Sequence, residues 1–118
     1  MCGIRGATCL EHDDAAEMFD AVGELLGRML EINNVAIEDV VSVILTCTQD
    51  LTSAFPAAGA RAIGLVDTPL MGAQEMDVAG ALERVIRILV HAETTTPRHQ
   101  MQHVYLRGAE VLRQDLQP

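Results

Sequence analysis

Between Asp14 and Asn33, apolar residues recur every three or four positions, which is the repeat of an amphipathic helix. Asp13 and Asp14 stand before this repeat as candidate N-caps, and Asn33-Asn34 mark its end. The apolar positions of the repeat are Met18, Phe19, Val22, Leu25, Leu26, Met29 and Leu30. The pattern predicts one long helix that buries a single face.

Much of the remaining chain has strand character, because β-branched and apolar residues cluster between turn-forming residues. A short helix is expected from Phe55-Pro56 to Gly64, since proline suits a first helical turn and glycine a C-terminal stop. We also expect a turn over residues 76–80 and one helical turn over 97–102. The predicted strands are residues 3–10, 40–48, 69–74, 84–94 and 103–112. This order predicts an α/β (α+β) fold, a mixed sheet of about five strands with the long helix on one face.

The 118 residues show no linker, repeat or break in composition, so we expect a single domain over residues 1–118. Apolar residues make up 49% of the chain, with two Phe, one Tyr and no Trp, which predicts an aliphatic core. Two strands are apolar on both faces, and the chain has little helix to cover the second face. That face is expected to meet another copy of the protein.

A formal net charge of -9 argues against nucleic acid as a partner, because phosphate binding needs a basic surface. No apolar run approaches the roughly 20 residues of a membrane span, so we expect no membrane association and a cytoplasmic location. Cys2, Cys9 and Cys47 are scattered outside any CxxC spacing and predict no disulfide or zinc site. His99 and His103 lack a third ligand, so no metal site is predicted.

Two arginines stand in unusual surroundings. Arg87 lies in the middle of the apolar segment 84–90, where strand alternation places it with Val85 and Leu89, and Arg5 lies between glycines. Buried guanidinium groups need an anion, and the planar fork of arginine grips carboxylates at two points. The pattern favours an anionic ligand. The alternative to a ligand is that Arg5 and Arg87 form structural ion pairs, in a chain that uses arginine throughout in place of lysine.

Six short segments carry a resemblance to a known family. They are Gly3-Ile4-Arg5-Gly6-Ala7-Thr8, residues 50–57 (DLTSAFPA), 74–78 (QEMDV), 84–87 (RVIR), 103–106 (HVYL) and 112–116 (LRQDL). In order and spacing, the chain resembles the monofunctional chorismate mutases of the trimeric α/β type, the AroH class. The resemblance implies a homotrimer whose sheets face inward as a pseudo-barrel core, with an active site at each subunit junction.

The implied reaction is the pericyclic (Claisen) rearrangement of chorismate to prephenate, in the shikimate pathway to phenylalanine and tyrosine. It needs no cofactor, no metal and no covalent intermediate. By resemblance, Arg87 contacts the ether oxygen and one carboxylate of chorismate, and Arg5 binds a carboxylate. Tyr105 donates to the same anion, and Glu75 accepts from the ring hydroxyl.

The resemblance also places Met71, Gly72, Ala73 and Gln74 beside the substrate. Positions that close the pocket from the neighbouring subunit are Phe55, Ala57, Arg61 and Leu112. The chain departs from some relatives at Gly72, which replaces a thiol or hydroxyl, and at Ala58, which replaces a lysine. These departures remove contacts that some relatives make.

Other interpretations stay open at this stage. Tyr105 shares a predicted strand face with His103 and Arg107 and fits a solvated surface; Glu75 fits a structural ion pair with Arg84 or Arg87. Arg61 and Arg113 fit solvated charges. The alternative functions are a Rid-type trimeric imine deaminase and a non-catalytic binding module for an aromatic-pathway acid.

Overall fold

The computed structural model describes the backbone of residues 1–116 and the side chains of residues 1–112. Its strands are β1 (Cys2–Cys9), β2 (Val40–Cys47), β3 (Leu70–Gln74), β4 (Val85–Ala92) and β5 (Val104–Tyr105). Its α-helices are α1 (Ala15–Ile32) and α2 (Pro56–Ala62). Three 3-10 helices, η1 (Ile37–Asp39), η2 (Arg98–Gln100) and η3 (Ala109–Leu116), complete the order of elements.

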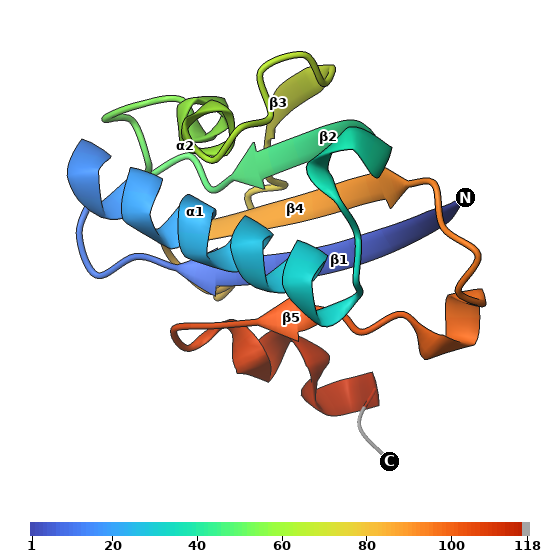
Figure 1. The fold of residues 1–118 in the computed structure, drawn as a ribbon. Coiled ribbons are helices and arrows are strands. Elements are labelled where there is room, and N and C mark those ends of the chain that lie inside the picture. Colours follow the sequence, from blue (N-terminus) through green and yellow to red (C-terminus); the bar gives the residue numbers. More distant parts are fainter. Residues whose placement is uncertain (117–118) are drawn as a thin grey trace.

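The strands form one five-stranded sheet in the order β3-β2-β4-β1-β5 (Figure 1). β4 pairs antiparallel with both β1 and β2, while β5 and β3 add to the two sides as parallel strands. Parallel neighbouring strands need a long crossover connection, and α2 lies in the connection between β2 and β3. The long helix, α1, lies in the connection between β1 and β2. The predicted mixed sheet with a long helix on one face is confirmed.

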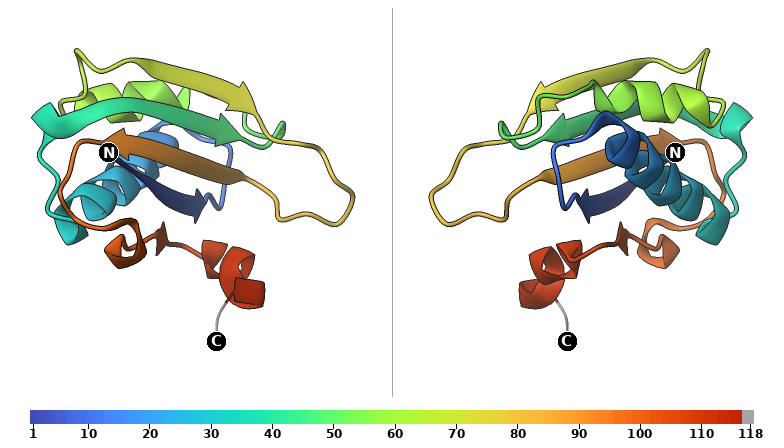
Figure 2. Two further views of the ribbon diagram at one scale, coloured as in Figure 1. Left: turned by 90° about the vertical axis from the view of Figure 1, so that its right-hand side faces the viewer. Right: turned by 90° about the vertical axis from the view of Figure 1, so that its left-hand side faces the viewer.

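Both α-helices cover the same face of the sheet, and within residues 1–116 the other face carries no α-helix (Figure 2). The core lies between α1 and the alternate positions of β1, β2 and β4 that point toward it, such as Ile4, Leu45 and Ile88. Two glycines allow this packing. A Cβ on Gly6 would lie 2.5 Å from Met29 Sδ, and a Cβ on Gly59 would lie 2.9 Å from Val22 Cβ.

The ends of α1 agree with the predicted caps. The Asp14 side chain accepts a hydrogen bond from the backbone N–H of Glu17, which satisfies a free donor of the first turn. At the other end, the Asn33 amide donates to the carbonyls of Met29 and Gln102, and Asn33 Oδ1 accepts from the Gln102 N–H. Asn33 therefore ends the helix and fastens it to the segment before β5.

The predicted last strand, residues 103–112, is wrong for all but two of its residues. Only Val104–Tyr105 is extended, and η3 begins at Ala109. Between them, Arg107 (φ 53°) and Gly108 (φ 94°) adopt left-handed backbone conformations, which end an extended strand. The Arg107 guanidinium is held 3.0 Å from carboxylates of Asp20 and Glu24 on α1. Contacts with a distant helix therefore turn the chain where local alternation predicts a continuing strand.

None of the helices among residues 1–116 is long and apolar enough to cross a bilayer.

Asp13, in the connection between β1 and α1, ties the loop after β2 to the start of the helix. Its carboxylate accepts hydrogen bonds from the N–H groups of Thr52 (3.1 Å) and Ser53 (3.0 Å) and from the Thr52 hydroxyl (2.9 Å). Hydrogen bonds from Ser53 and Thr52 lower the pKa of the Asp13 carboxyl below its ordinary value of 3.8. The charged form is therefore favoured by folding.

A carboxyl with a lowered pKa stabilises the fold above its ordinary pKa, and that stabilisation is lost as pH falls through the lowered value. We expect Asp13→Asn to melt at a lower temperature than the wild type at neutral pH. The difference should shrink as the pH falls below 3.8. Thermal melts over a pH series measure it, with the exposed Asp67→Asn as the control for net charge. A difference that does not change with pH would contradict the assignment.

Candidate active site

A cavity of about 410 Å³ opens on the sheet face that carries no α-helix. Its polar lining consists of Arg5, Thr46, Glu75, Arg87 and Tyr105. Its apolar side chains include Ala7, Ile44, Leu89 and Leu112. The four residues that the sequence predicts as catalytic thus line one cavity within a single chain.

The register of the sheet explains how these side chains meet. Arg87 on β4 pairs with Ala7 on β1 and Thr46 on β2, and Ala7 pairs in turn with Tyr105 on β5. Residues paired across a sheet point to the same face, so these four form one row across the strands. Ala7 contributes only a methyl group between Arg87 and Tyr105, so the smallest side chain of the row lies between these two. A second row joins Arg5 with Leu89 and Ile44.

Glu75 and Arg87 form the central charged pair. Arg87 Nε lies 3.4 Å from Glu75 Oε2, and the Thr46 hydroxyl donates a hydrogen bond to the same oxygen. The Glu75 N–H bonds to Cys47 O at 2.9 Å, one residue past the end of β3, which sets the carboxylate over the row. The side chain of Glu75 is 19% exposed and that of Arg87 is 52% exposed. Such a half-exposed pair contributes about 0–1 kcal/mol, too little to account for an arginine in an apolar strand.

Arg5 and Tyr105 lie on neighbouring strands at the other side of the cavity. The Arg5 N–H bonds to His103 Nδ1 at 3.0 Å, which fixes the start of β5 against β1. Tyr105 is half-buried and lines the cavity, whereas Arg107 turns to the acidic side chains of α1. The interpretation that Tyr105 shares a solvated strand face with Arg107 is therefore wrong.

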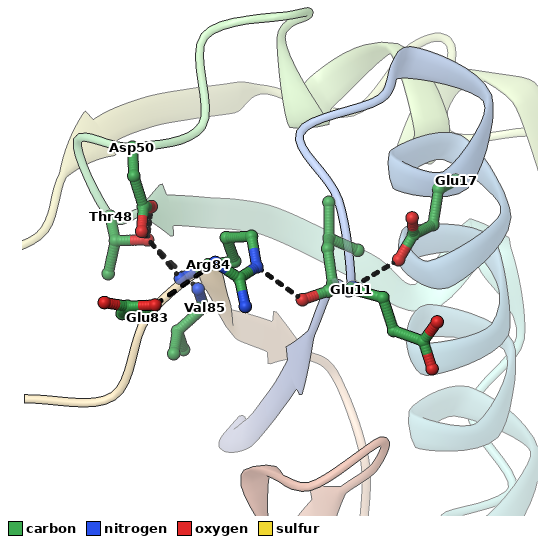
Figure 3. Close-up of polar contacts among 8 residues, drawn as sticks. Glu11, Glu17, Thr48, Asp50, Glu83, Arg84 and Val85 are labelled. Carbon is green, nitrogen blue, oxygen red and sulfur yellow. Dashed lines mark hydrogen bonds and ion pairs between the residues drawn. The ribbon is translucent and has the colours of Figure 1, made fainter.

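Arg84 has a structural role outside the cavity (Figure 3). It precedes β4 in a left-handed conformation (φ 49°), which corrects the expected start of that strand. Its Nε donates to Leu10 O at 3.0 Å and its Nη1 pairs with Glu83 at 3.2 Å, while its backbone N–H bonds to Asp50 at 3.1 Å. The partner of Glu75 is therefore Arg87.

Apart from Leu112, the other predicted substrate contacts do not line this cavity within one chain. Phe55, Ala57 and Arg61 belong to α2 or its N-cap, and the Phe55 residue is 82% exposed. The β3 residues Met71, Gly72, Ala73 and Gln74 are exposed along the edge strand. Leu112 lines the cavity of its own chain, whereas the resemblance implied a position reaching in from a neighbour. The Arg113 side chain lies outside the described residues.

Sequence reasoning missed Thr46, Ala7 and Ile44 as cavity residues. Alternation along residues 40–48 places Thr46 and Ile44 on one strand face, and that signal was available. The pairing of this strand with Arg87 was not available, because no local pattern sets the register of distant strands.

The chemistry of the cavity follows from its residues. Two guanidinium groups can each bind a carboxylate, and Glu75 can accept a hydrogen bond from a ligand hydroxyl. The nearby Cys47 is a poor nucleophile, because burial, Glu75, Asp50 and Asp13 raise the pKa of its thiol. Among the described residues, no group of three or more His, Cys, Asp or Glu side chains is placed to hold a metal ion.

Comparisons with known proteins agree with one another. Residues 1–116 match the family model described as chorismate mutase type I. The chain is 49% identical over 116 residues to the chorismate mutase AroH of Thermus thermophilus, covering 98% of this chain and 95% of that protein. It is 42% identical over 115 residues to chorismate mutase AroH of Bacillus subtilis (strain 168), with 97% and 91% covered. A solved chorismate mutase from Clostridium thermocellum superposes with a TM-score of 0.91 at 42% identity, covering 92% of this chain and 97% of that one.

Proposed function

The chain belongs to the chorismate mutase type I family, and from that membership we propose that it rearranges chorismate to prephenate on the route to phenylalanine and tyrosine. The observation that supports this function best is the row of Arg87, Thr46, Ala7 and Tyr105, with Glu75 above it and Arg5 beside it. A dianion with a hydroxyl matches that set of groups in charge and in hydrogen bonding. A biosynthetic role of this kind is expected in the cytoplasm.

The reaction breaks an ether bond of chorismate while a carbon–carbon bond forms in the same molecule. Negative charge develops on the ether oxygen only as its bond breaks, so a fixed cation beside it stabilises the transition state more than the substrate. We assign this role to Arg87, since its half-exposed guanidinium can contact a ligand in the cavity. The rearrangement is unimolecular and calls for positioning and charge, so no cofactor is proposed.

The remaining assignments come from the resemblance to the family, and the lining of the cavity by the same residues supports them. Arg5 binds a carboxylate of chorismate, Tyr105 donates its hydroxyl to the same anion, and Glu75 accepts from the ring hydroxyl. Leu112 adds an apolar side chain to the lining of the cavity. The β3 residues from Met71 to Gln74 border the substrate along the sheet edge.

We further propose that the active protein is a homotrimer. Among the described residues, no α-helix covers the sheet face opposite α1 (Figure 2), and the apolar residues Phe55 (82%), Met71 (65%) and Met76 (84%) are strongly exposed in the single chain. Burial of such residues against other copies would remove them from water. Phe55, Ala57 and Arg61 would then close the cavity of a neighbouring subunit. Light scattering at assay concentration should give the mass of three chains, and an active monomer would contradict the trimer.

The test of the function is direct. Purified protein incubated with chorismate should yield prephenate, and turnover should survive dialysis against EDTA. Binding of chorismate without formation of prephenate would favour the non-catalytic binding module. The family match over residues 1–116 argues against the imine deaminase alternative.

Tyr105→Phe should have a small effect on this reaction. The variant loses the hydrogen bond that a neutral hydroxyl donates to the substrate carboxylate, but Arg5 still binds that carboxylate and the half-buried site gives water access to it, so the loss should lie at the low end for hydrogen bonds. We expect a cost of about 0.5–1.5 kcal/mol, which is about 2–12-fold in kcat/KM. Steady-state kinetics of the purified variant measure it. A loss as large as that of Arg5→Ala would overturn the assignment of the two residues.

A further inference from the structure

We propose that Thr46 is a positioning residue for this reaction, whose hydroxyl holds the Glu75 carboxylate in the orientation that receives the substrate. The inference rests on the proposed function and adds a residue to its site. Thr46 lies on β2 in the row that contains Arg87, and its Oγ1 donates to Glu75 Oε2. No motif in the sequence singles it out.

The two contacts of Glu75 converge on one atom. Within the described part of the chain, the hydrogen bond from Thr46 and the ion pair with Arg87 both engage Oε2. Oε1 is then the oxygen that is left to accept a hydrogen bond from a ligand. Thr46 thus divides the carboxylate into one oxygen that is held by the protein and one that serves the substrate.

The hydroxyl also limits how closely Glu75 pairs with Arg87. Carboxylates and guanidinium groups favour bidentate pairing through two parallel hydrogen bonds. In this structure the approach is a single contact of 3.4 Å from Arg87 Nε. With Oε2 bonded to Thr46, the carboxylate is restrained from rotating both oxygens toward Arg87. The positive charge of Arg87 then remains available to the ether oxygen in the transition state.

The location of Thr46 makes this role testable without disturbing the sheet. Thr46 is half-buried on β2, and valine has the same branched shape and a similar preference for strands. Ser42 provides a matched control on the same strand. Its hydroxyl lies 3.2 Å from His91 Nδ1 on β4, and neither residue lines the cavity.

The experiment compares Thr46→Val, Thr46→Ser and Ser42→Ala in steady-state assays with chorismate. We expect Thr46→Val to lower kcat/KM by about 10–30-fold, as for the loss of a hydrogen bond to a charged group. Most of the loss should fall on kcat. The released carboxylate would pair more closely with Arg87 and offset the positive charge that stabilises the transition state. Thr46→Ser should recover activity to within about threefold of the wild type, and Ser42→Ala should stay within about twofold.

A double-mutant cycle separates positioning from a structural role. In the Glu75→Ala background, Thr46→Val should cause little further loss, because the carboxylate that Thr46 positions is no longer present. Additive losses, or failure of the serine variant to restore turnover, would overturn the proposal. If the valine variant does not fold by circular dichroism, Thr46→Ala and the serine variant carry the same comparison. Wild-type protein that does not turn over chorismate would instead refute the proposed function.

Discussion

Arg87→Ala is expected to reduce kcat by at least about 10²–10³-fold, or about 3–4 kcal/mol, the scale for losing one preorganised charge donor. The loss should fall on kcat more than on KM, because the ether oxygen gains charge only as its bond breaks. Arg87→Lys should recover part of this loss, since it keeps the charge but lacks the planar fork and the reach. Steady-state kinetics with chorismate measure both variants.

The structure predicts that Arg87→Ala folds. The Arg87 side chain is 52% exposed, and its ion pair with Glu75 contributes about 0–1 kcal/mol to stability. Arg84→Ala is the matched control, because Arg84 precedes the same strand and bonds to Leu10 O away from the cavity. Its variant should melt at a lower temperature while the folded fraction retains turnover. Folded, trimeric Arg87→Ala with near-normal turnover would refute the proposed mechanism.

Glu75→Ala is expected to lower kcat/KM by about 10–150-fold, which corresponds to the loss of about 1.5–3 kcal/mol from a charge-assisted hydrogen bond. The variant removes the proposed acceptor for the ring hydroxyl and leaves the Thr46 hydroxyl without its Glu75 partner. Glu75→Gln keeps an amide oxygen at the same place and should lose less activity than the alanine variant. Kinetics of both variants, at matched folded concentration, give the comparison.

Glu83→Gln is the control for Glu75, because it alters an exposed carboxylate that pairs with Arg84 outside the cavity. Its activity should stay within about twofold of the wild type. The assignment of Glu75 as a hydroxyl acceptor fails if Glu75→Ala and Glu83→Gln have equal activities. Equal losses for Glu75→Gln and Glu75→Ala would show that the negative charge, rather than the acceptor position, is required.

Much of the fold could be predicted from local pattern. The long helix follows from apolar residues at helical spacing and from the Asp14 cap, both of which act within a few residues. The short helix begins at Pro56. After its end, Gly64 adopts a left-handed backbone conformation (φ 113°), which glycine permits. The arginines were identified because each is conspicuous among apolar or small neighbours. The roles of Arg5, Glu75 and Tyr105 came from resemblance to a family.

The local pattern failed where distant contacts override it. Residues 103–112 alternate as a strand does, yet Arg107 is drawn to Asp20 and Glu24 on α1, and the chain turns into η3. That turn places Leu112 at the cavity of its own chain. The energy of these contacts depends on how α1 packs on the sheet.

By itself, the sequence determined the helices and most strands. It also determined that Arg87 and Leu89 share one face of their strand. These features depend on neighbours within a few positions. Only the tertiary structure decided that Thr46 lies opposite Arg87, with Ala7 between Arg87 and Tyr105. Strand register is set by burial of the whole core face, since a slip of one residue would turn every apolar side chain outward. The cavity and the position of Thr46 beside Glu75 are consequences of that register.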